Sequence, residues 1–299
     1  MRKLLLFAFC LMPSLSLAQT RPAITGIAFM RVYTDDVPAA EHLYGWTMGY
    51  DEKHNGEEMV FPINRHQWIE VMPSQLRDGQ SYMASLGFTV SDVAAMKRYL
   101  IAKGLKDVQS PDAGLVEVKD PEGNLVCFVQ KDSPLREAVL ARDTPLSTRA
   151  PSHHIIHVGM IVHDRAKEDA FWKDILGFRP YWYGTMHPPT LDWVSQQVPD
   201  GTDWLEYMMA PNQQPNKHDF GMSDHFSLGV DRMQTVLHDL QRNGCQDKQC
   251  TAIQAGKDGK IQLNLFDPDQ TRIEYMEFTP VMDPCCSQFT GAHPNPDEH

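Results

Sequence analysis

The sequence predicts an α+β fold in two similar halves, each built from two modules in which a strand, a helix and further strands follow one another. Three observations carry this prediction. Short strand-like apolar runs precede helical patterns, the same order of motifs occurs twice, and a segment rich in Thr, Pro and Ser separates the two copies. The length of 299 residues also suits two domains, at roughly 150 residues each.

The first module of each half is expected to run from a strand through a capped helix to a glycine followed by an aromatic residue. An aspartate directly after a strand is a favourable helix N-cap, and a glycine is a favourable helix end. The matching segments are residues 24–34 with Asp35 and Asp36, then Gly49-Tyr50, and residues 154–162 with Asp164, then Gly177-Phe178.

The later motifs of the two halves also correspond, which makes four modules in all. Residues 67–72 match 203–208, residues 85–88 match 227–230, and Asp120-Pro121 matches Asp267-Pro268 before the last strand of each half. We therefore expect the following order: a first domain at 23–132, a linker at 142–152, a second domain at 153–279 and a tail at 280–299 that runs extended along the surface.

Composition excludes several classes of protein. The chain is 42% hydrophobic and 22% charged, as expected for a globular protein. Its net charge is −12, and it has no basic blocks, so we expect no nucleic-acid partner. A small molecule is the expected partner, and a homodimer is a further option.

The N-terminus has the pattern of a secretory signal peptide. Arg2 and Lys3 precede an apolar run at 4–12, and Ser16 and Ala18 supply the small residues before a cleavage point. We expect residues 1–18 to be removed and the mature protein to be periplasmic or extracellular, without a membrane segment. A short N-terminal membrane anchor is the alternative, although this apolar run is too brief to span a bilayer.

Export changes how the cysteines are interpreted, because an oxidising compartment permits disulfides. Cys245 and Cys250 are close enough in sequence to close a small ring, and either one is also able to pair with Cys285 or Cys286. Free thiols are the remaining alternative. None of these spacings is typical of a zinc site.

This repeated plan resembles the vicinal oxygen chelate (VOC) superfamily of glyoxalase I, bleomycin resistance proteins, extradiol ring-cleaving dioxygenases and epimerases. The resemblance rests on the exit Leu176-Gly177-Phe178 and on Asp267-Pro268 before the last strand, and it spans residues 23–279. It implies two tandem VOC domains, each pairing two βαβββ modules into a half-barrel that is able to cup one divalent metal.

Four side chains of the second half stand at the strand positions where the superfamily holds its metal: His157, Glu206, His225 and Glu274. Strand alternation places apolar neighbours such as Ile156 toward the helices, and the His and Glu side chains toward the opposite face. Two imidazoles with one or two carboxylates suit one divalent Fe, Mn, Zn, Ni or Co ion. Glu206 is either a fourth ligand or a structural carboxylate.

The first half is an internal control for this site. Its corresponding positions are expected to be Phe29, Glu70, Met83 and Cys127, of which only the glutamate is retained. We therefore expect no comparable metal site in the first domain, which would have a structural or substrate-shaping role.

The resemblance implies a metal-dependent enzyme with two alternative chemistries. A triad of His157, His225 and Glu274 on Fe(II) would leave room for a catechol and O₂, as in extradiol dioxygenases. If Glu206 completes a two-His-two-Glu site, the chain is instead similar to glyoxalase I, a lyase or isomerase in which Glu206 or Glu274 acts as base. A non-catalytic binding protein is the third interpretation.

Two further features bear on catalysis. His187 lies in a segment expected to form a loop over the cup, where it is a candidate acid or base. Residues 255–266 contain neither the His nor the Tyr that extradiol enzymes carry before their last strand.

Overall fold

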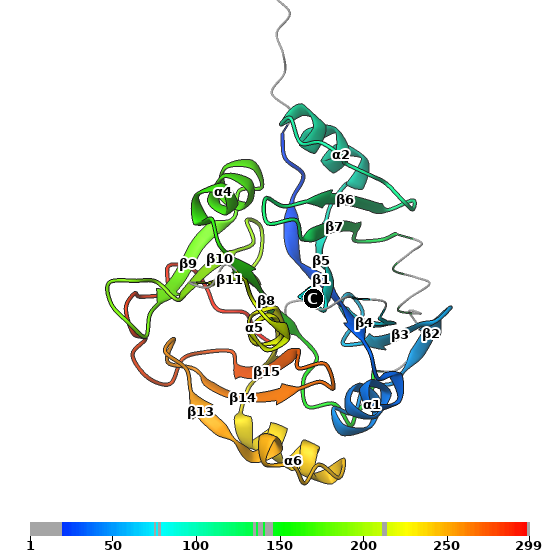
Figure 1. Ribbon diagram of the computed structural model, residues 1–299, viewed down its shortest axis with the longest axis vertical. Helices are drawn as coiled ribbons and strands as arrows, with labels where there is room; N and C mark the ends of the chain where they lie inside the picture. The colour runs from blue at the N-terminus through cyan, green and yellow to red at the C-terminus, as the bar shows by residue number, and fades with distance from the viewer. Residues whose placement is uncertain are drawn as a thin grey trace, which may run out of the picture.

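The computed structural model describes residues 20–74, 76, 79–133, 136, 140, 146–210 and 214–297. Within this part, two mixed β-sheets lie beside each other with helices at both ends (Figure 1). The expected signal peptide and the first residues of the expected linker, 142–145, lie outside the described residues. None of the described helices has the length and apolarity needed to cross a bilayer.

The first half forms a sheet with the strand order β2-β3-β4-β1-β5-β7-β6. The first strand, β1, pairs in parallel with β4 and antiparallel with β5, which in turn pairs in parallel with β7. Its elements are β1 (Ile24–Thr34), α1 (Val37–Glu41), β2 (Lys53–Asn55), β3 (Glu58–Pro62), β4 (Trp68–Pro73), β5 (Met83–Val90), α2 (Val93–Ala102), β6 (Leu115–Lys119) and β7 (Leu125–Gln130).

The second half repeats this arrangement in the order β13-β14-β15-β12-β8-β11-β10-β9. Again the first strand, β8, pairs in parallel with β11 and antiparallel with β12, and β12 pairs in parallel with β15. Its elements are β8 (Ile155–Val162), α4 (Arg165–Asp169), β9 (Arg179–Gly184), β10 (Trp193–Gln197), β11 (Trp204–Met209), α5 (Lys217–Ser223), β12 (His225–Val230), α6 (Met233–Arg242), β13 (Ile253–Ala255), β14 (Ile261–Phe266) and β15 (Arg272–Glu277).

The predicted α+β plan of repeated modules is confirmed, and the helix caps follow the predicted signals. Asp36 begins α1 by accepting a hydrogen bond from the backbone N–H of Ala39 (3.1 Å), and Asp164 begins α4 in the same way with Lys167 (3.2 Å). One module departs from the plan. Among the described residues, α2 is followed by two strands and an isolated bridge at Gln109, and not by three strands.

The helices pair across the two halves. At one end, the Asn243 amide after α6 donates to the carbonyl of Thr47 after α1 (3.1 Å). At the other end, the Tyr99 hydroxyl of α2 donates to the carbonyl of Ile175 after α4 (2.6 Å). Figure 1 shows the same pairs, α1 near α6 and α2 near α4. Phe88 also packs against the aromatic rings of the second half, so the core continues between the halves.

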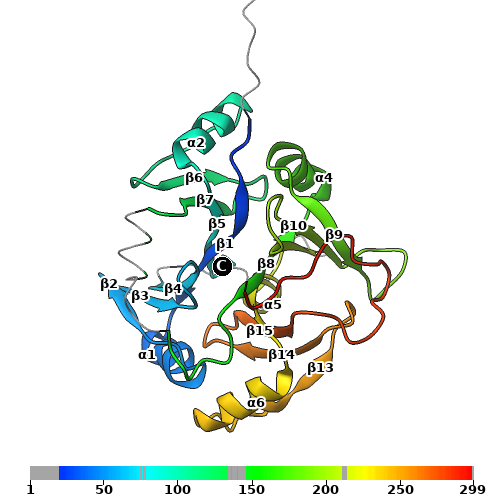
Figure 2. The same cartoon turned by 180° about the vertical axis from the view of Figure 1, so that it is seen from behind.

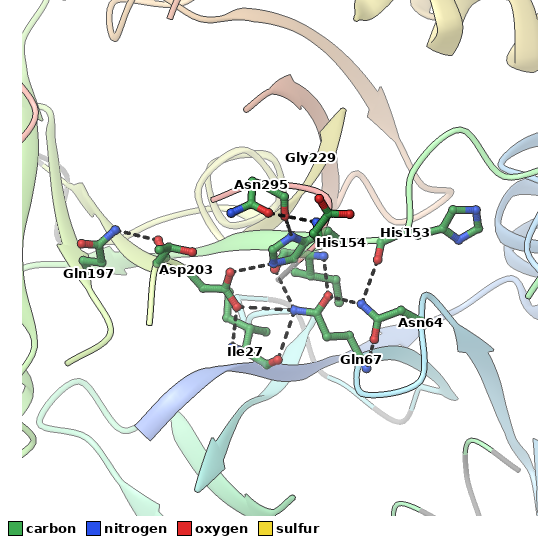
Figure 3. A network of polar contacts seen from close by, with 12 residues as sticks. Ile27, Asn64, Gln67, His153, His154, Gln197, Asp203, Gly229 and Asn295 are labelled. Carbon is green, nitrogen blue, oxygen red and sulfur yellow. Dashed lines mark hydrogen bonds and ion pairs between the residues drawn. The ribbon is translucent and has the colours of Figure 1, made fainter. Parts of the chain in front are cut away.

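A buried polar network joins the two sheets (Figure 3). Asp203 accepts a hydrogen bond from the backbone N–H of Ile27 (2.8 Å) and pairs with His154 Nε2 (2.8 Å). The Gln67 amide donates to the Ile27 carbonyl (3.1 Å). His154 Nδ1 lies 3.0 Å from the Asn295 carbonyl. Both ring nitrogens of His154 therefore face oxygen atoms, one of them in the Asp203 carboxylate of the same buried network.

The tail, expected to be extended, has no helix or strand in its described part, 280–297. It runs past β9 toward the junction of the two sheets, as the red trace in Figure 2 shows. Thr290 N donates to the Tyr181 carbonyl (3.0 Å), and the Gln197 amide donates to the Ala292 carbonyl (2.8 Å). Phe289 packs against Tyr181, with ring centroids 4.9 Å apart, and against the buried cluster that includes Trp182 and Trp204, so the tail is held against the second sheet.

Candidate metal centre

Two rows of side chains run across the central strands of the second sheet. The first row is Trp204, His157, Ser227 and Glu274, which stand beside one another on β11, β8, β12 and β15. The second row is Glu206, Gly159 and His225, which stand on β11, β8 and β12, two residues away from the first row on each strand. The strand pairing therefore gathers residues from distant parts of the chain into one small patch.

Three predicted ligands meet in this patch. The nearest potential ligand atoms of His157, His225 and Glu274 all lie within 4.8 Å of one another. The two Nε2 atoms are 3.0 Å apart, and His157 Nε2 lies 3.3 Å from Glu274 Oε2. Both imidazoles are 0% exposed and Glu274 is 3% exposed, so the two rings are closed off from solvent and the carboxylate is almost entirely buried. Such a cluster is costly unless a cation or protons balance it.

The hydrogen bonds of His225 decide which nitrogen is available. Its Nδ1 lies 2.7 Å from the Ser223 carbonyl, so Nδ1 carries the proton and Nε2 presents its lone pair to the cluster. Burial, the first cause, lowers the pKa of His157 and of His225 well below the usual histidine value, and Arg272 acts in the same direction on both. Both rings are therefore neutral, which is the form that binds a metal.

A missing side chain makes room for His225. A Cβ atom on Gly159 would lie 2.0 Å from Cε1 of the His225 ring, so only glycine fits at this position. This role was not predicted from the sequence, because Gly159 stands on a different strand from the ring it accommodates. Arg272, whose NH2 lies 2.8 Å from His225 Nε2, was not predicted either. The position of Arg272 near the cluster could have been predicted from the sequence, because Arg272 stands two residues before Glu274 and therefore shares its strand face.

Glu206 lies at the edge of the cluster. Its Oε2 is 3.7 Å from His225 Nε2, and its Oε1 lies 3.3 Å from the Ser195 hydroxyl. Burial and the neighbouring Glu274 raise the pKa of Glu206 to about 8, and burial raises the pKa of Glu274 to about 7. Glu206 is not among the three residues whose donor atoms come within 4.8 Å of one another, so a three-residue donor set fits this geometry better than a four-residue set.

A cavity of about 380 Å³ opens onto Glu206, Arg272 and Glu274. Its apolar walls are Trp182, Met186, Trp193 and Met276, and its polar lining includes Gln254, Asp258 and Gln262. This volume and this mixture of aromatic walls with a few polar groups suit a small molecule. His187 is exposed in the loop beside Met186, and the structure gives its imidazole no contact with the cluster, so its catalytic role stays a prediction.

One expectation about strand direction is wrong. Val158 lies in the main core as predicted, but Ile156 packs with Trp182 and Trp204 on the cup side. The pairing of β8 with β12 shifts by one residue next to His157, and such an irregularity reverses the alternation of side chains.

The first half has the same two rows with different side chains. Its first row is Trp68, Phe29, Gly87 and Cys127, and its second is Glu70, Arg31 and Ser85. Ser85 is thus the counterpart of His225, and the expected counterpart, Met83, is two residues away from that position. The Arg31 guanidinium pairs with Glu70, and Trp68 Nε1 donates to the same carboxylate (2.6 Å).

This cup of the first half cannot hold a metal in the same way. Within the described residues, three ligating side chains come this close together only at His157, His225 and Glu274. Phe29 stacks on Trp68 with ring centroids 5.0 Å apart, and the His157 ring lies tilted against Trp204 at 4.7 Å. Burial raises the pKa of the Cys127 thiol to about 12, so it stays protonated.

Comparisons with known proteins agree with this architecture. Residues 154–275 match the model of the Glyoxalase/Bleomycin resistance protein/Dioxygenase superfamily. No curated protein matches the sequence. Among solved structures, catechol 2,3-dioxygenase is similar with a TM-score of 0.66 and 16% identity, covering 92% of this chain and 95% of that one.

Two other dioxygenases have the same architecture. The 2,3-dioxygenase LapB from Pseudomonas sp. KL28 has a TM-score of 0.63 and 14% identity, covering 94% of this chain and 97% of that one. Homoprotocatechuate 2,3-dioxygenase from Brevibacterium fuscum, in complex with 3,4-dihydroxyphenylacetate, has a TM-score of 0.63 and 16% identity, covering 94% and 85%. The second half of the chain, over residues 154–275, is therefore similar to the Glyoxalase/Bleomycin resistance protein/Dioxygenase superfamily, and the chain as a whole has the fold of the two-domain extradiol dioxygenases.

Proposed function

We propose that this protein is an extradiol-dioxygenase-like enzyme that depends on a divalent metal and acts on a small substrate with two neighbouring oxygens. The observation that carries the proposal is the buried cluster of His157, His225 and Glu274 in a fold shared with ring-cleaving dioxygenases. Two imidazoles and one carboxylate on adjacent strands are a donor set typical of non-haem Fe(II).

The residues present fit such a metal. His157, His225 and Glu274 would hold it, because all three are buried, both rings are neutral, and the His225 lone pair points into the cluster. Fe(II) is the favoured ion, and Mn, Zn, Ni and Co suit the same donors. When bound, the metal would supply a Lewis acid with open positions for substrate oxygens and, in the oxygenase, for O₂.

The chain itself would orient the substrate and exclude water. Trp182 and Trp193 form the apolar wall of the cavity and favour a flat ring over a flexible chain. Glu206 Oε2 faces the cluster from the cavity side, where it is placed to accept a proton from a substrate hydroxyl. Phe289 of the tail packs against Trp182, with ring centroids 6.3 Å apart, and so supports this wall.

A lyase or isomerase similar to glyoxalase I is the second candidate. The 3.7 Å separation between Glu206 Oε2 and His225 Nε2 favours it, because a modest movement would bring this carboxylate into a two-His-two-Glu donor set. The two candidates differ in whether Glu206 is needed to hold the metal.

Metal analysis of the purified mature protein tests the proposal. We expect one divalent ion per chain, lost in His225→Ala and kept in the matched control His238→Ala, an exposed histidine of α6. Bound Fe that survives Glu206→Gln, together with consumption of O₂ on addition of catechols, supports the dioxygenase. Zn, Ni or Mn that is lost in Glu206→Gln supports the lyase or isomerase. Absence of metal after loading with each ion would overturn both.

We also infer that the protein is exported to the periplasm or beyond. The support is the pattern of residues 1–18 in the sequence. The pairing of Cys245 with Cys250 and of Cys285 with Cys286 in the structure is compatible with an oxidising compartment. N-terminal sequencing of the protein recovered from the periplasm should begin at Gln19, and an intact Met1 in the cytoplasm would contradict the inference.

A further inference from the structure

Two disulfides of the second half differ in how exposed their cysteines are. Cys285 pairs with Cys286, the next residue in the chain, and Cys286 is exposed on the tail. Cys245 pairs with Cys250 after α6, and Cys250 is only 1% exposed. Because a thiol must reach the sulfur that it attacks, the pair in the tail is the more readily reduced of the two. Cys286 also has a φ of 75°, a left-handed conformation that residues other than glycine rarely adopt, and the bond to its neighbour restrains it there.

The turn of the tail that starts at Cys285 is bonded to both edges of the second sheet, which are β9 and β13 (Figure 2). On the β9 side, Trp182 Nε1 donates to the Cys285 carbonyl (3.2 Å). Beside it, Tyr183 N donates to the Ser287 hydroxyl (2.9 Å). On the β13 side, Cys285 N donates to the carbonyl of Lys257, in the loop between β13 and β14 (2.7 Å). The turn therefore ties the two edges of the sheet to each other.

The same contacts reach the walls of the cavity at the candidate metal centre. Trp182 and Lys257, which hold the backbone of Cys285, both line this cavity. The two sulfur atoms of the turn lie 4.0 and 3.9 Å from the carbonyl of Thr185, and the next residue, Met186, lines the cavity as well. The position of the turn therefore fixes cavity walls that belong to opposite edges of the sheet.

We propose that the Cys285–Cys286 disulfide is a redox-modification site that a dithiol reduces, and that its reduction frees the turn and loosens the cavity. One thiolate of the dithiol attacks Cys286 Sγ, the S–S bond breaks, and Cys285 leaves as a thiolate that takes up a proton. The second thiolate of the dithiol then attacks its own bound sulfur, so Cys286 also leaves and takes up a proton. The dithiol departs as a cyclic disulfide, having given two electrons to the protein. The inference rests on the proposed function only for the identity of the molecule in the cavity.

The adjacency of the two cysteines selects a dithiol over a monothiol. After a monothiol has attacked Cys286, the released thiolate of Cys285 is held in the neighbouring residue at a high effective concentration. It displaces the monothiol and closes the disulfide again. A dithiol avoids this reversal, because its own second thiol competes from within the same mixed disulfide.

Amide hydrogen exchange of the full mature protein, without added metal, tests this proposal. Dithiothreitol should raise the exchange rates of the Tyr183 and Cys285 amides about tenfold, because both donate hydrogen bonds that join the turn to the edges of the sheet. The amides of β11, a strand inside the sheet, should keep their rates. The monothiol 2-mercaptoethanol, at the same thiol concentration, should leave all of these rates unchanged.

Two double variants complete the test. Cys285→Ser with Cys286→Ser should exchange at Tyr183 as the reduced wild type does, and it should not respond to dithiothreitol. The matched control, Cys245→Ser with Cys250→Ser, removes the other disulfide and should respond at Tyr183 as the wild type does.

Alkylation of the wild type followed by mass spectrometry identifies which cysteines are reduced. Alkylated Cys285 and Cys286 after dithiothreitol, with the Tyr183 and Cys285 amides still at their original rates, would overturn the inference. Alkylation of both cysteines before any reductant is added would overturn it as well, because the disulfide would be absent. A protein that responds to dithiothreitol as described but binds no metal would contradict the proposed function alone.

Discussion

The two sheets carry different side chains at the same four register positions: His157, Gly159, His225 and Glu274 in the second, and Phe29, Arg31, Ser85 and Cys127 in the first. The strand arrangement is the same in both sheets. In each sheet a tryptophan pairs with the first of these positions, and a glutamate pairs with the second. The difference lies in how the buried glutamate is balanced. In the first half the Arg31 side chain pairs with Glu70, whereas in the second half Gly159 has no side chain and leaves room for the His225 ring.

This comparison teaches that the residue at one strand position determines whether the buried glutamate of a half-barrel is balanced by an internal cation or left for an external one. Arg31 and Gly159 stand on equivalent strand positions, next to a glutamate on one side and to Ser85 or His225 on the other. A long cation there satisfies the glutamate internally. A glycine there admits an imidazole and leaves the carboxylates for an external cation.

The largest effect is expected from Gly159→Arg, which gives the second half the arginine that the first half has at the equivalent position. The new side chain would displace the His225 ring and pair with Glu206, so metal affinity should fall more than about 100-fold. Titration with a metal-sensitive dye measures this loss. Gly45→Ala is the matched control, because a Cβ there meets its nearest atom at 3.7 Å, an ordinary contact. Retained metal binding in Gly159→Arg would contradict the claim that this position determines whether the half-barrel is able to bind a metal.

A smaller effect is expected from opening the first cup with Arg31→Met. This change leaves Glu70 buried without its cation, so the free energy of unfolding should fall by about 3 kcal/mol, while metal binding in the second half stays unchanged. Denaturant unfolding measures the loss. The double variant Arg31→Met with Glu70→Gln should recover part of it, and an additive double variant would show that the two side chains do not depend on each other.

The smallest effect concerns the two Asp-Pro turns. Burial raises the pKa of Asp267 to about 7 and that of Asp120 to about 6, above the usual aspartate value of 3.8. The folded protein therefore holds these protons more tightly than the unfolded chain, so their contribution to stability is lost as the pH rises from about 4 toward 7. In Asp267→Asn, the unfolding free energy lost over this pH range should be smaller than in the wild type by about 1–2 kcal/mol, and in Asp120→Asn the difference should be less. Unfolding free energies from pH 4 to 8 measure it, and a variant with the wild-type slope would contradict the assignment.

Much of the fold was predictable because the repeat can be recognised from short local sequence motifs. Asp36 and Asp164 are helix caps, and the predicted metal-type residues stand on strands whose pairing follows from the repeat. The order of modules therefore needed no knowledge of long-range contacts.

The errors came from features that depend on strand pairing. The shift in register beside His157 placed Ile156 on the cup side, and register, not sequence similarity, made Ser85 the counterpart of His225. Gly159 and Arg272 act through the ring of a residue on another strand, so neither has a local signature. The packing of the tail against Tyr181 was missed for the same reason.

Locating the metal in crystals of the metal-loaded protein tests the central claim most directly. Anomalous scattering should show one ion per chain, bound by His157, His225 and Glu274 with donor distances of about 2.0–2.2 Å, and no ion between Phe29, Ser85 and Cys127. Glu206 within the same distance would favour the lyase or isomerase over the dioxygenase. A metal bound elsewhere, with this cluster empty, would contradict the account.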